Sequence, residues 1–240
     1  MTSPFDRLLA RATADQRVLG VVLGGGRGKG FATEYSDWDV YVATVEGADN
    51  AGIRADLDAG SDDLELLWVA SLDAFRSHAT VGTDDEWNAY NFVHLKPDLD
   101  RSDGELKAIC DSKEFLPPEY ARSKATRFLD GYLNSLYRSL KNQRDGNLVA
   151  AHLDAAESVC HLLGFIFAAE GRVRPYNKFL IWELARHPLA GDWWATGDPA
   201  PELLAGGTPF SKFERQARKF GFSDVLDDWG DPALGLLRAT

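Results

Sequence analysis

The pattern of apolar residues changes in the middle of the chain, and this change restricts the possible folds more than any other feature. Before Pro117 and Pro118, apolar runs are short and of strand length, as in residues 18–23. After them, apolar residues recur at intervals of three and four, the period of a helix with one buried face. The pattern predicts an α+β protein with a small mixed-sheet domain over 1–116 and a helical-bundle domain over 117–240. The helical stripe consists of Phe128, Leu129, Tyr132, Leu133, Leu136, Tyr137 and Leu140.

Local patterns and breakers predict the elements of each half. Gly171 is expected to end the long second helix of the helical half. Residues 47–60 fit either a linker or a helix. In the first half, the expected elements are a helix over 5–17 and strands over 18–23, 38–42, 62–70 and 91–95. In the second half, helices are expected along the stripe and over 147–170, 176–186 and 210–222.

Charge and cysteine content restrict the partners and the compartment. The formal net charge is -11 over 240 residues. Proteins that bind phosphate backbones carry an excess of Lys and Arg, so nucleic acid is disfavoured as a partner, while an acidic cleft attracts cationic small molecules. Cys110 and Cys160 lack metal-ligand spacing, which favours a reducing compartment. We find neither a signal-peptide pattern nor an apolar run of about 18 residues, so we expect a cytoplasmic protein without a membrane span.

Two aspartates lie at the start of the second expected strand. Asp37 and Asp39 are two residues apart, so both carboxylates point to one face of the strand, and Trp38 and Val40 point to the other. Two carboxylates on one face repel each other unless a cation lies between them. Mg²⁺ takes carboxylate and phosphate oxygens as ligands. The pair therefore predicts a magnesium site.

The third expected strand supplies a further carboxylate. Asp63 and Glu65 share one of its faces. If this strand pairs with the second, Glu65 approaches Asp37 and Asp39, and three carboxylates can hold two ions about 3.5–4 Å apart. Glu65 can also accept the proton of an attacking hydroxyl, and Asp63 is the competing choice. The opposite face is expected to carry Leu64, Leu66 and Trp68.

A glycine-rich loop comes shortly before the aspartates. Residues 24–30 read Gly-Gly-Gly-Arg-Gly-Lys-Gly, and glycine lets the backbone approach an anion closely and present N–H groups to it. Arg27 and Lys29 add positive charge. A Walker A loop is excluded, because glycine follows Gly28-Lys29 and Leu23 occupies the position of the first glycine. A Rossmann fingerprint fits in no register, so the loop predicts phosphate binding next to a metal site.

Residues 25–39 resemble the signature of polymerase β-like nucleotidyltransferases, a Gly-Ser pair followed by Ser-Asp-x-Asp. The resemblance implies a nucleotidyltransferase core that uses two Mg²⁺ ions and ATP as co-substrate. In this family Asp37, Asp39 and Glu65 would be the catalytic, metal-binding residues. The residues expected to contact the nucleotide are Gly25, Gly26, Arg27, Lys29 and Ser36.

The second half resembles the substrate-binding domain of the antibiotic-modifying members. Residues 170–172 followed by Lys178 are similar to their helix–turn–lysine, in which the lysine contacts the triphosphate. Asp154 and Glu157 fall near positions used for nucleotide or substrate, although a solvated helix face is the competing interpretation. The resemblance implies adenylyl transfer to a hydroxyl of a small, aminoglycoside-like acceptor. It also implies a monomer or a homodimer.

Gly26 departs from the family pattern, which has a serine at this position. The serine hydroxyl normally contacts the terminal phosphates, and losing one such hydrogen bond costs about 1–3 kcal/mol. The alternative is therefore a catalytically weak or protein-modifying, antitoxin-like nucleotidyltransferase that acts on a partner protein. Transfer to RNA ends is disfavoured by the acidic charge.

Overall fold

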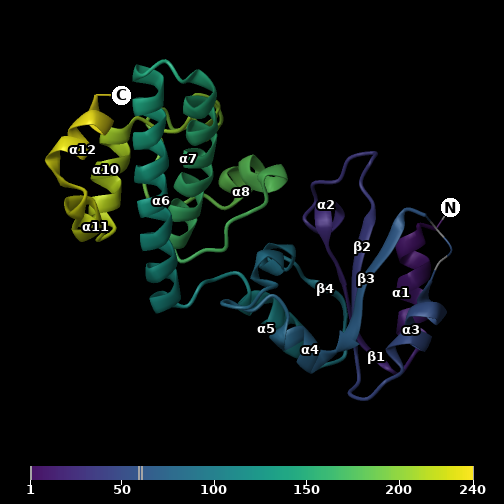
Figure 1. Ribbon diagram of the computed structural model, residues 1–240. Helices are drawn as coiled ribbons and strands as arrows, with labels where there is room; N and C mark the ends of the chain where they lie inside the picture. Colours follow the sequence, from purple (N-terminus) through teal and green to yellow (C-terminus); the bar gives the residue numbers. More distant parts are fainter. Residues whose placement is uncertain (1, 59, 61, 240) are drawn as a thin grey trace. The chain divides into compact units, whose positions relative to one another are not determined.

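The chain folds into two compact units, Met1–Phe115 and Leu116–Thr240. The computed structural model describes residues 2–58, 60 and 62–239 (Figure 1). The first unit contains a four-stranded sheet with helices, and the second is helical, so the protein is α+β. The boundary between the units lies one residue before the expected one.

The sheet of the first unit is mixed, with the strand order β3-β2-β1-β4. β1 runs antiparallel to both of its neighbours, and β2 and β3 are parallel. A parallel pair needs a crossover connection, which α3 supplies here. The strands are β1 (Val18–Leu23), β2 (Trp38–Thr44), β3 (Leu64–Ser71) and β4 (Pro97–Asp100).

The strand expected over residues 91–95 was wrong. This segment follows the 3-10 helix η1 (Glu86–Asn91) and forms turns, with His94 at a φ of 62° that a strand does not allow. Phe92, Val93 and Leu95 are apolar because they are buried in the first unit, not because they form a strand. The fourth strand begins at Pro97, on an edge strand where the missing N–H is tolerated.

One face of the sheet packs against α1 (Pro4–Ala14) and α3 (Asn50–Leu57), which lie side by side in Figure 1. α1 begins with a capping box in which Ser3 accepts from the Asp6 N–H and Asp6 accepts from the Ser3 N–H. The segment left open over 47–60 thus contains a helix, and its residue 59 lies outside the described residues. The core of this face comprises Phe5, Leu8, Ala12, Val18, Val21, Val40, Val42, Ile53, Leu57 and Val69.

The other face carries an aromatic cluster near α4 (Leu72–Ser77) and α5 (Glu105–Ser112). The register between β2 and β3 shifts, pairing Val40 with Leu66 but Tyr41 with Trp68, so that Leu67 is an extra residue. The expectation that Trp68 shares a face with Leu66 was therefore wrong. Its ring lies 4.8 Å from that of Phe75, a residue of α4.

The second unit is built on α6 (Pro118–Arg144) and α7 (Leu148–Ala169), a helical hairpin. The helix expected over 147–170 corresponds to α7, and the segment expected over 176–186 is split between the 3-10 helix η2 (Asn177–Phe179) and α8 (Leu180–Arg186). The aromatic residues of the tail pack against α6, with Phe213 4.7 Å from Tyr132 between ring centroids. The remaining helices are α9 (Pro199–Leu204), α10 (Phe210–Lys219), α11 (Ser223–Asp228) and α12 (Gly230–Arg238).

By length and composition alone, α7 is the one described helix that can cross a membrane. Core helices of soluble proteins pass the same test. Every residue from Leu162 to Ala168 is buried within the helical unit, and Asp154 and Glu157 on the same helix form ion pairs with α6. These contacts are those of a core helix, and they are compatible with a soluble protein.

Candidate metal and nucleotide site

The structure brings the carboxylates of Asp37, Asp39 and Glu65 together. One oxygen of each carboxylate lies within 4.8 Å of the other two. Asp39 and Glu65 are direct partners in the parallel register of β2 and β3, so their side chains leave the sheet on the same face. Asp37 comes one residue before β2, where the Trp38 N–H donates to the Asp63 carbonyl at 2.8 Å. The side chain of Asp63, the competing choice, is not part of the cluster.

The donor set and the spacing fit a hard divalent cation. Octahedral Mg²⁺ has ligands at about 2.1 Å, so opposite ligands lie about 4.2 Å apart. Three ligands of one ion include at most one opposite pair, so the three oxygens, which lie within 4.8 Å of one another, have to move closer together to share one ion. Asp37 and Glu65 are exposed and Asp39 is half-buried, which leaves room for substrate oxygens on the same ion.

The glycine loop lies directly against Asp39. It forms a single helical turn, α2 (Gly25–Gly28), between β1 and β2. The Gly24 N–H donates to the Asp39 carbonyl at 2.7 Å. Gly25 has a φ of 56°, and a Cβ on it would lie 1.8 Å from Asp39 Oδ2. Only glycine therefore lets the backbone approach the Asp39 carboxylate this closely.

Gly26 is buried inside the same turn. A Cβ on this residue would lie 3.1 Å from the Phe31 carbonyl oxygen and 3.4 Å from Ser36 Oγ. Ser36 is itself buried, and its hydroxyl accepts the N–H of Thr33 at 2.9 Å. A side chain at position 26 would thus start inside the loop, next to the Ser36 hydroxyl.

Arg27 and Lys29, expected to contact phosphate, have partners within the first unit. Arg27 donates to the carbonyls of Ser36 and Asp37. Lys29 is only 7% exposed, and its Nζ donates to the Val93 carbonyl. The sequence did not indicate these contacts, because every residue has a backbone carbonyl and residue type does not show which one is the acceptor.

The three remaining predicted residues belong to the helical unit. Asp154 and Glu157 both pair with Arg138 at 2.8 Å. Asn142 also donates to Asp154 and Ser135 to Glu157, so this network links α6 to α7. Asp154 is half-buried and needs such partners, whereas Glu157 is exposed; for both residues the contacts give a structural role in joining the two helices.

Lys178 lies in η2 and is exposed. Its Nζ is 5.4 Å from the centroid of the Phe179 ring, a weak cation–π contact. Its expected contact with the triphosphate stays a prediction.

A histidine that the sequence did not single out lies on the aromatic face of the sheet. The His78 ring lies 4.4 Å from the Trp68 ring, its Nδ1 is 2.6 Å from Asp85 Oδ2, and its Nε2 is 2.8 Å from Asn88 Nδ2. Hydrogen bonds from the Ala79 N–H and then the Thr83 hydroxyl lower the pKa of Asp85 to about 2. These contacts fasten the loop after α4 to the sheet. No spacing rule predicts a trio at positions 78, 85 and 88.

Comparison of the chain with models of known protein families finds no match, and no curated protein matches it either. Its function is therefore inferred from the residues of the site.

Proposed function

We propose that the chain is a Mg²⁺-dependent nucleotidyltransferase of the polymerase β type. It transfers a nucleoside monophosphate, adenylyl by preference, from a triphosphate such as ATP to a hydroxyl of a small acceptor. One observation carries the proposal: three carboxylates from two neighbouring strands converge beside a glycine turn that touches one of them. The proposed location is the cytoplasm.

Asp37, Asp39 and Glu65 would hold the metal. Their oxygens are the hard ligands that Mg²⁺ prefers, and two carboxylates plus substrate phosphates are its usual protein ligand set. When bound, Mg²⁺ supplies Lewis-acid stabilisation of the negative charge that develops on the phosphoryl oxygens.

Glu65 is assigned the role of proton acceptor. It is exposed and belongs to the cluster, so an acceptor hydroxyl can approach it. The hydroxyl oxygen forms a bond to the α-phosphorus, the bond from this phosphorus to the bridging oxygen of the β-phosphate breaks, and pyrophosphate leaves. The hydroxyl proton passes to the Glu65 carboxylate.

The acceptor is proposed to be a cationic polyol of the aminoglycoside type. A net charge of -11 attracts cations and repels polyanions at long range. The same charge disfavours RNA ends as acceptors.

Pyrophosphate release tests the activity. The protein is assayed with ATP and Mg²⁺ against a panel of aminoglycosides and uncharged polyols. We expect release with at least one cationic polyol, and a loss of about 10²-fold or more in Asp39→Asn with the fold retained. Asp63→Asn, which changes an exposed acid outside the cluster, is the matched control and is expected to keep full activity. An active Asp39→Asn variant would remove the mechanism.

Gly26 favours a second candidate, a weak or protein-modifying nucleotidyltransferase. The variant Gly26→Ser separates the two. The start of a serine side chain is within 3.4 Å of Ser36 Oγ, and the tight 3.1 Å contact with the Phe31 carbonyl needs a shift of a few tenths of an ångström. If Gly26 limits a small-molecule enzyme, the serine should raise kcat/KM, by about 5-fold or more for a hydrogen bond of about 1 kcal/mol. No release by either form, together with stable binding of a protein partner, would favour the second candidate.

A further inference from the structure

We propose that Arg27 is a positioning residue for the metal site rather than a phosphate ligand. It holds the backbone in front of β2 and thereby sets the affinity of the carboxylate cluster for divalent ions. This inference rests on the proposed function, because it assigns a role to a neighbour of the same cluster.

The guanidinium group forks onto two consecutive carbonyl groups. Arg27 Nε lies 3.0 Å from the Ser36 carbonyl oxygen and 3.1 Å from that of Asp37, and Nη2 lies 2.6 Å from the Ser36 oxygen. A planar guanidinium has its donors in a fixed arrangement, so such a fork defines the orientation of the acceptors. The two peptide groups of residues 36 and 37 are therefore fixed relative to the glycine turn.

The Arg27 guanidinium is itself held in place by stacking on Trp38, which in turn stacks on a residue of the core. The guanidinium carbon lies 4.1 Å from the centroid of the Trp38 ring, at cation–π distance. On the core side, Trp38 stacks on Phe5 with centroids 5.6 Å apart and planes 4° from parallel. Phe5 is a buried residue of α1. Arg27 is thus fastened to the same core that carries β2.

Asp37 needs this support more than its two partners. Asp39 and Glu65 lie within strands, whose ladders fix their backbones. Asp37 lies outside β2, and its exposed carboxylate accepts no hydrogen bond from the described part of the chain. Its position therefore depends on its backbone, and Arg27 binds its carbonyl. Without the hydrogen bonds from Arg27, the Asp37 carboxylate would sample other positions. Metal binding would then have to order this carboxylate at a cost in conformational entropy, which lowers the affinity for the ion.

The positioning role and the phosphate role predict different measurements. Loss of a positioning residue lowers the affinity for the metal ion and leaves the other steps unchanged. A high concentration of the ion therefore restores the activity of the variant. A phosphate ligand changes the KM for ATP at saturating ion and has little effect on ion binding. Lysine keeps the charge but cannot reproduce the fork, so it should rescue a phosphate role better than a positioning role.

Mn²⁺ binding to the intact protein tests the proposal, measured by the loss of the free-ion electron paramagnetic resonance signal. We expect the Kd for Mn²⁺ to rise about tenfold in Arg27→Gln and by less in Arg27→Lys. We also expect excess Mn²⁺ to return pyrophosphate release to near the wild-type rate. Thermal unfolding by circular dichroism shows whether each variant is folded. If Arg27→Gln does not fold, the Mn²⁺ affinity of Arg27→Lys tests the positioning role.

Arg122 is the matched control. Its guanidinium lies 4.0 Å from the Phe222 ring and its Nη1 donates to the Gly221 carbonyl at 2.6 Å, the same pair of contacts in the helical unit. Arg122→Gln should lower stability without changing the Mn²⁺ affinity.

Two outcomes would overturn the inference. One is an unchanged Mn²⁺ affinity in folded Arg27→Gln or Arg27→Lys, with a raised KM for ATP at saturating ion pointing to a phosphate ligand. The other is absence of Mn²⁺ binding by the wild type, which would overturn the proposed function as well.

Discussion

At the residue scale, two glycines of the same loop have left-handed backbones for different reasons. Gly25 and Gly30 have φ values of 56° and 68°. Nothing lies within 4 Å of a Cβ on Gly30, whereas a Cβ on Gly25 would overlap the Asp39 carboxylate. Gly30 therefore requires glycine for its backbone conformation alone, and Gly25 requires it both for its backbone conformation and for the close contact with Asp39.

Alanine at each position separates these requirements. We expect Gly30→Ala to cost about 1–2 kcal/mol of stability, the strain of a left-handed L-residue, and to leave Mn²⁺ affinity unchanged. Gly25→Ala adds a displacement of Asp39, so we expect weaker Mn²⁺ binding and a loss of activity of about 10²-fold. Urea unfolding and Mn²⁺ titration of both variants check this, and equal Mn²⁺ affinities would contradict the close approach.

At the element scale, the aromatic face of the sheet depends on a loop fastened by one carboxylate. Asp85 receives the Ala79 N–H at 3.0 Å, and Oδ2 lies 2.6 Å from His78. Ala79 has a φ of 54°, an unfavourable conformation that the surrounding contacts must hold. The loop is therefore expected to loosen when this carboxylate is lost.

The lowered pKa of Asp85 determines how the stability of this loop depends on pH. The pKa of Asp85 is lowered from 3.8 to about 2 in the folded chain, so its ionised form binds the loop better than its protonated form. The resulting stability is complete above about pH 4 and is lost as the pH falls towards 2. We expect Asp85→Asn to have a lower free energy of unfolding than wild type at neutral pH. Urea unfolding should show this difference in free energy becoming smaller between pH 4 and pH 2.

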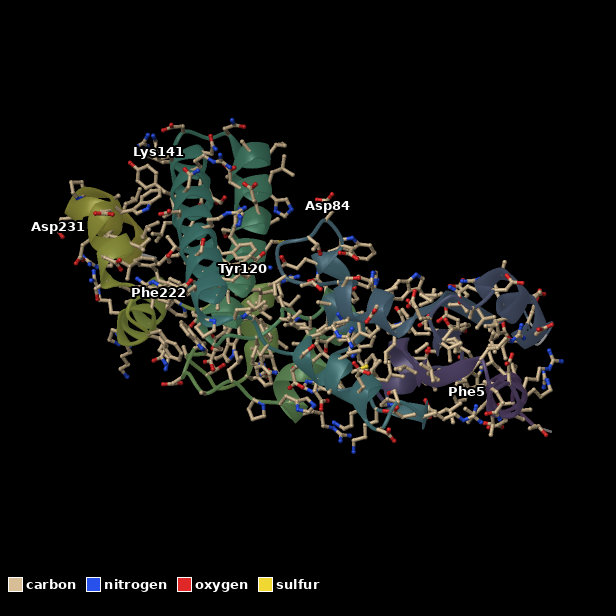
Figure 2. All side chains as sticks on the ribbon, turned by 90° about the horizontal axis from the view of Figure 1, so that it is seen from below. Phe5, Asp84, Tyr120, Lys141, Phe222 and Asp231 are labelled. Atoms are coloured by element: carbon tan, nitrogen blue, oxygen red, sulfur yellow. The ribbon has the colours of Figure 1, made fainter. Side chains whose placement is uncertain are left out.

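Asp84 is the control for this prediction, because its exposed side chain points away from the ribbon at the tip of the same loop (Figure 2). Asp84→Asn should follow the wild-type profile. A difference between Asp85→Asn and wild type that stays constant down to pH 2 would show that the carboxylate charge is not responsible.

The elements also show what the sequence could predict. Alternation along β3 and along the segment that enters β2 predicted the faces of Asp37, Asp39 and Glu65, because side-chain direction follows from strand geometry. Their convergence also required β2 to pair with β3, which the sequence analysis assumed and the structure shows. The extra residue Leu67 was not predictable, since a bulge depends on pairing with β2. The same limit applies to Arg27, whose acceptors are backbone oxygens that every residue has.

At the scale of the whole molecule, the predicted site residues are divided between two compact units. The three carboxylates and the glycine turn lie in the first, and Asp154, Glu157 and Lys178 lie in the second. A ligand that binds the native state stabilises the part of the chain that forms its site. Metal binding alone should therefore act on the first unit.

Hydrogen exchange tests this division. On adding Mg²⁺ to the intact protein, we expect slower exchange of amides in β2, β3 and the glycine loop, and unchanged exchange in α6 and α7. A matched sample of Asp39→Asn should show no slowing. Metal-dependent protection confined to α7 would place the ion on Asp154 and Glu157 instead.

The proposed function requires a divalent ion to bind where β2, β3 and the glycine turn meet. A crystal grown with Mn²⁺ and a non-hydrolysable ATP analogue, measured at a wavelength that gives anomalous scattering from manganese, tests it most directly. We expect an anomalous peak within coordination distance of the carboxylates of Asp37, Asp39 and Glu65, with phosphate oxygens completing the coordination of the ion. A bound nucleotide with no peak at these carboxylates, or a peak coordinated only by other residues, would contradict it.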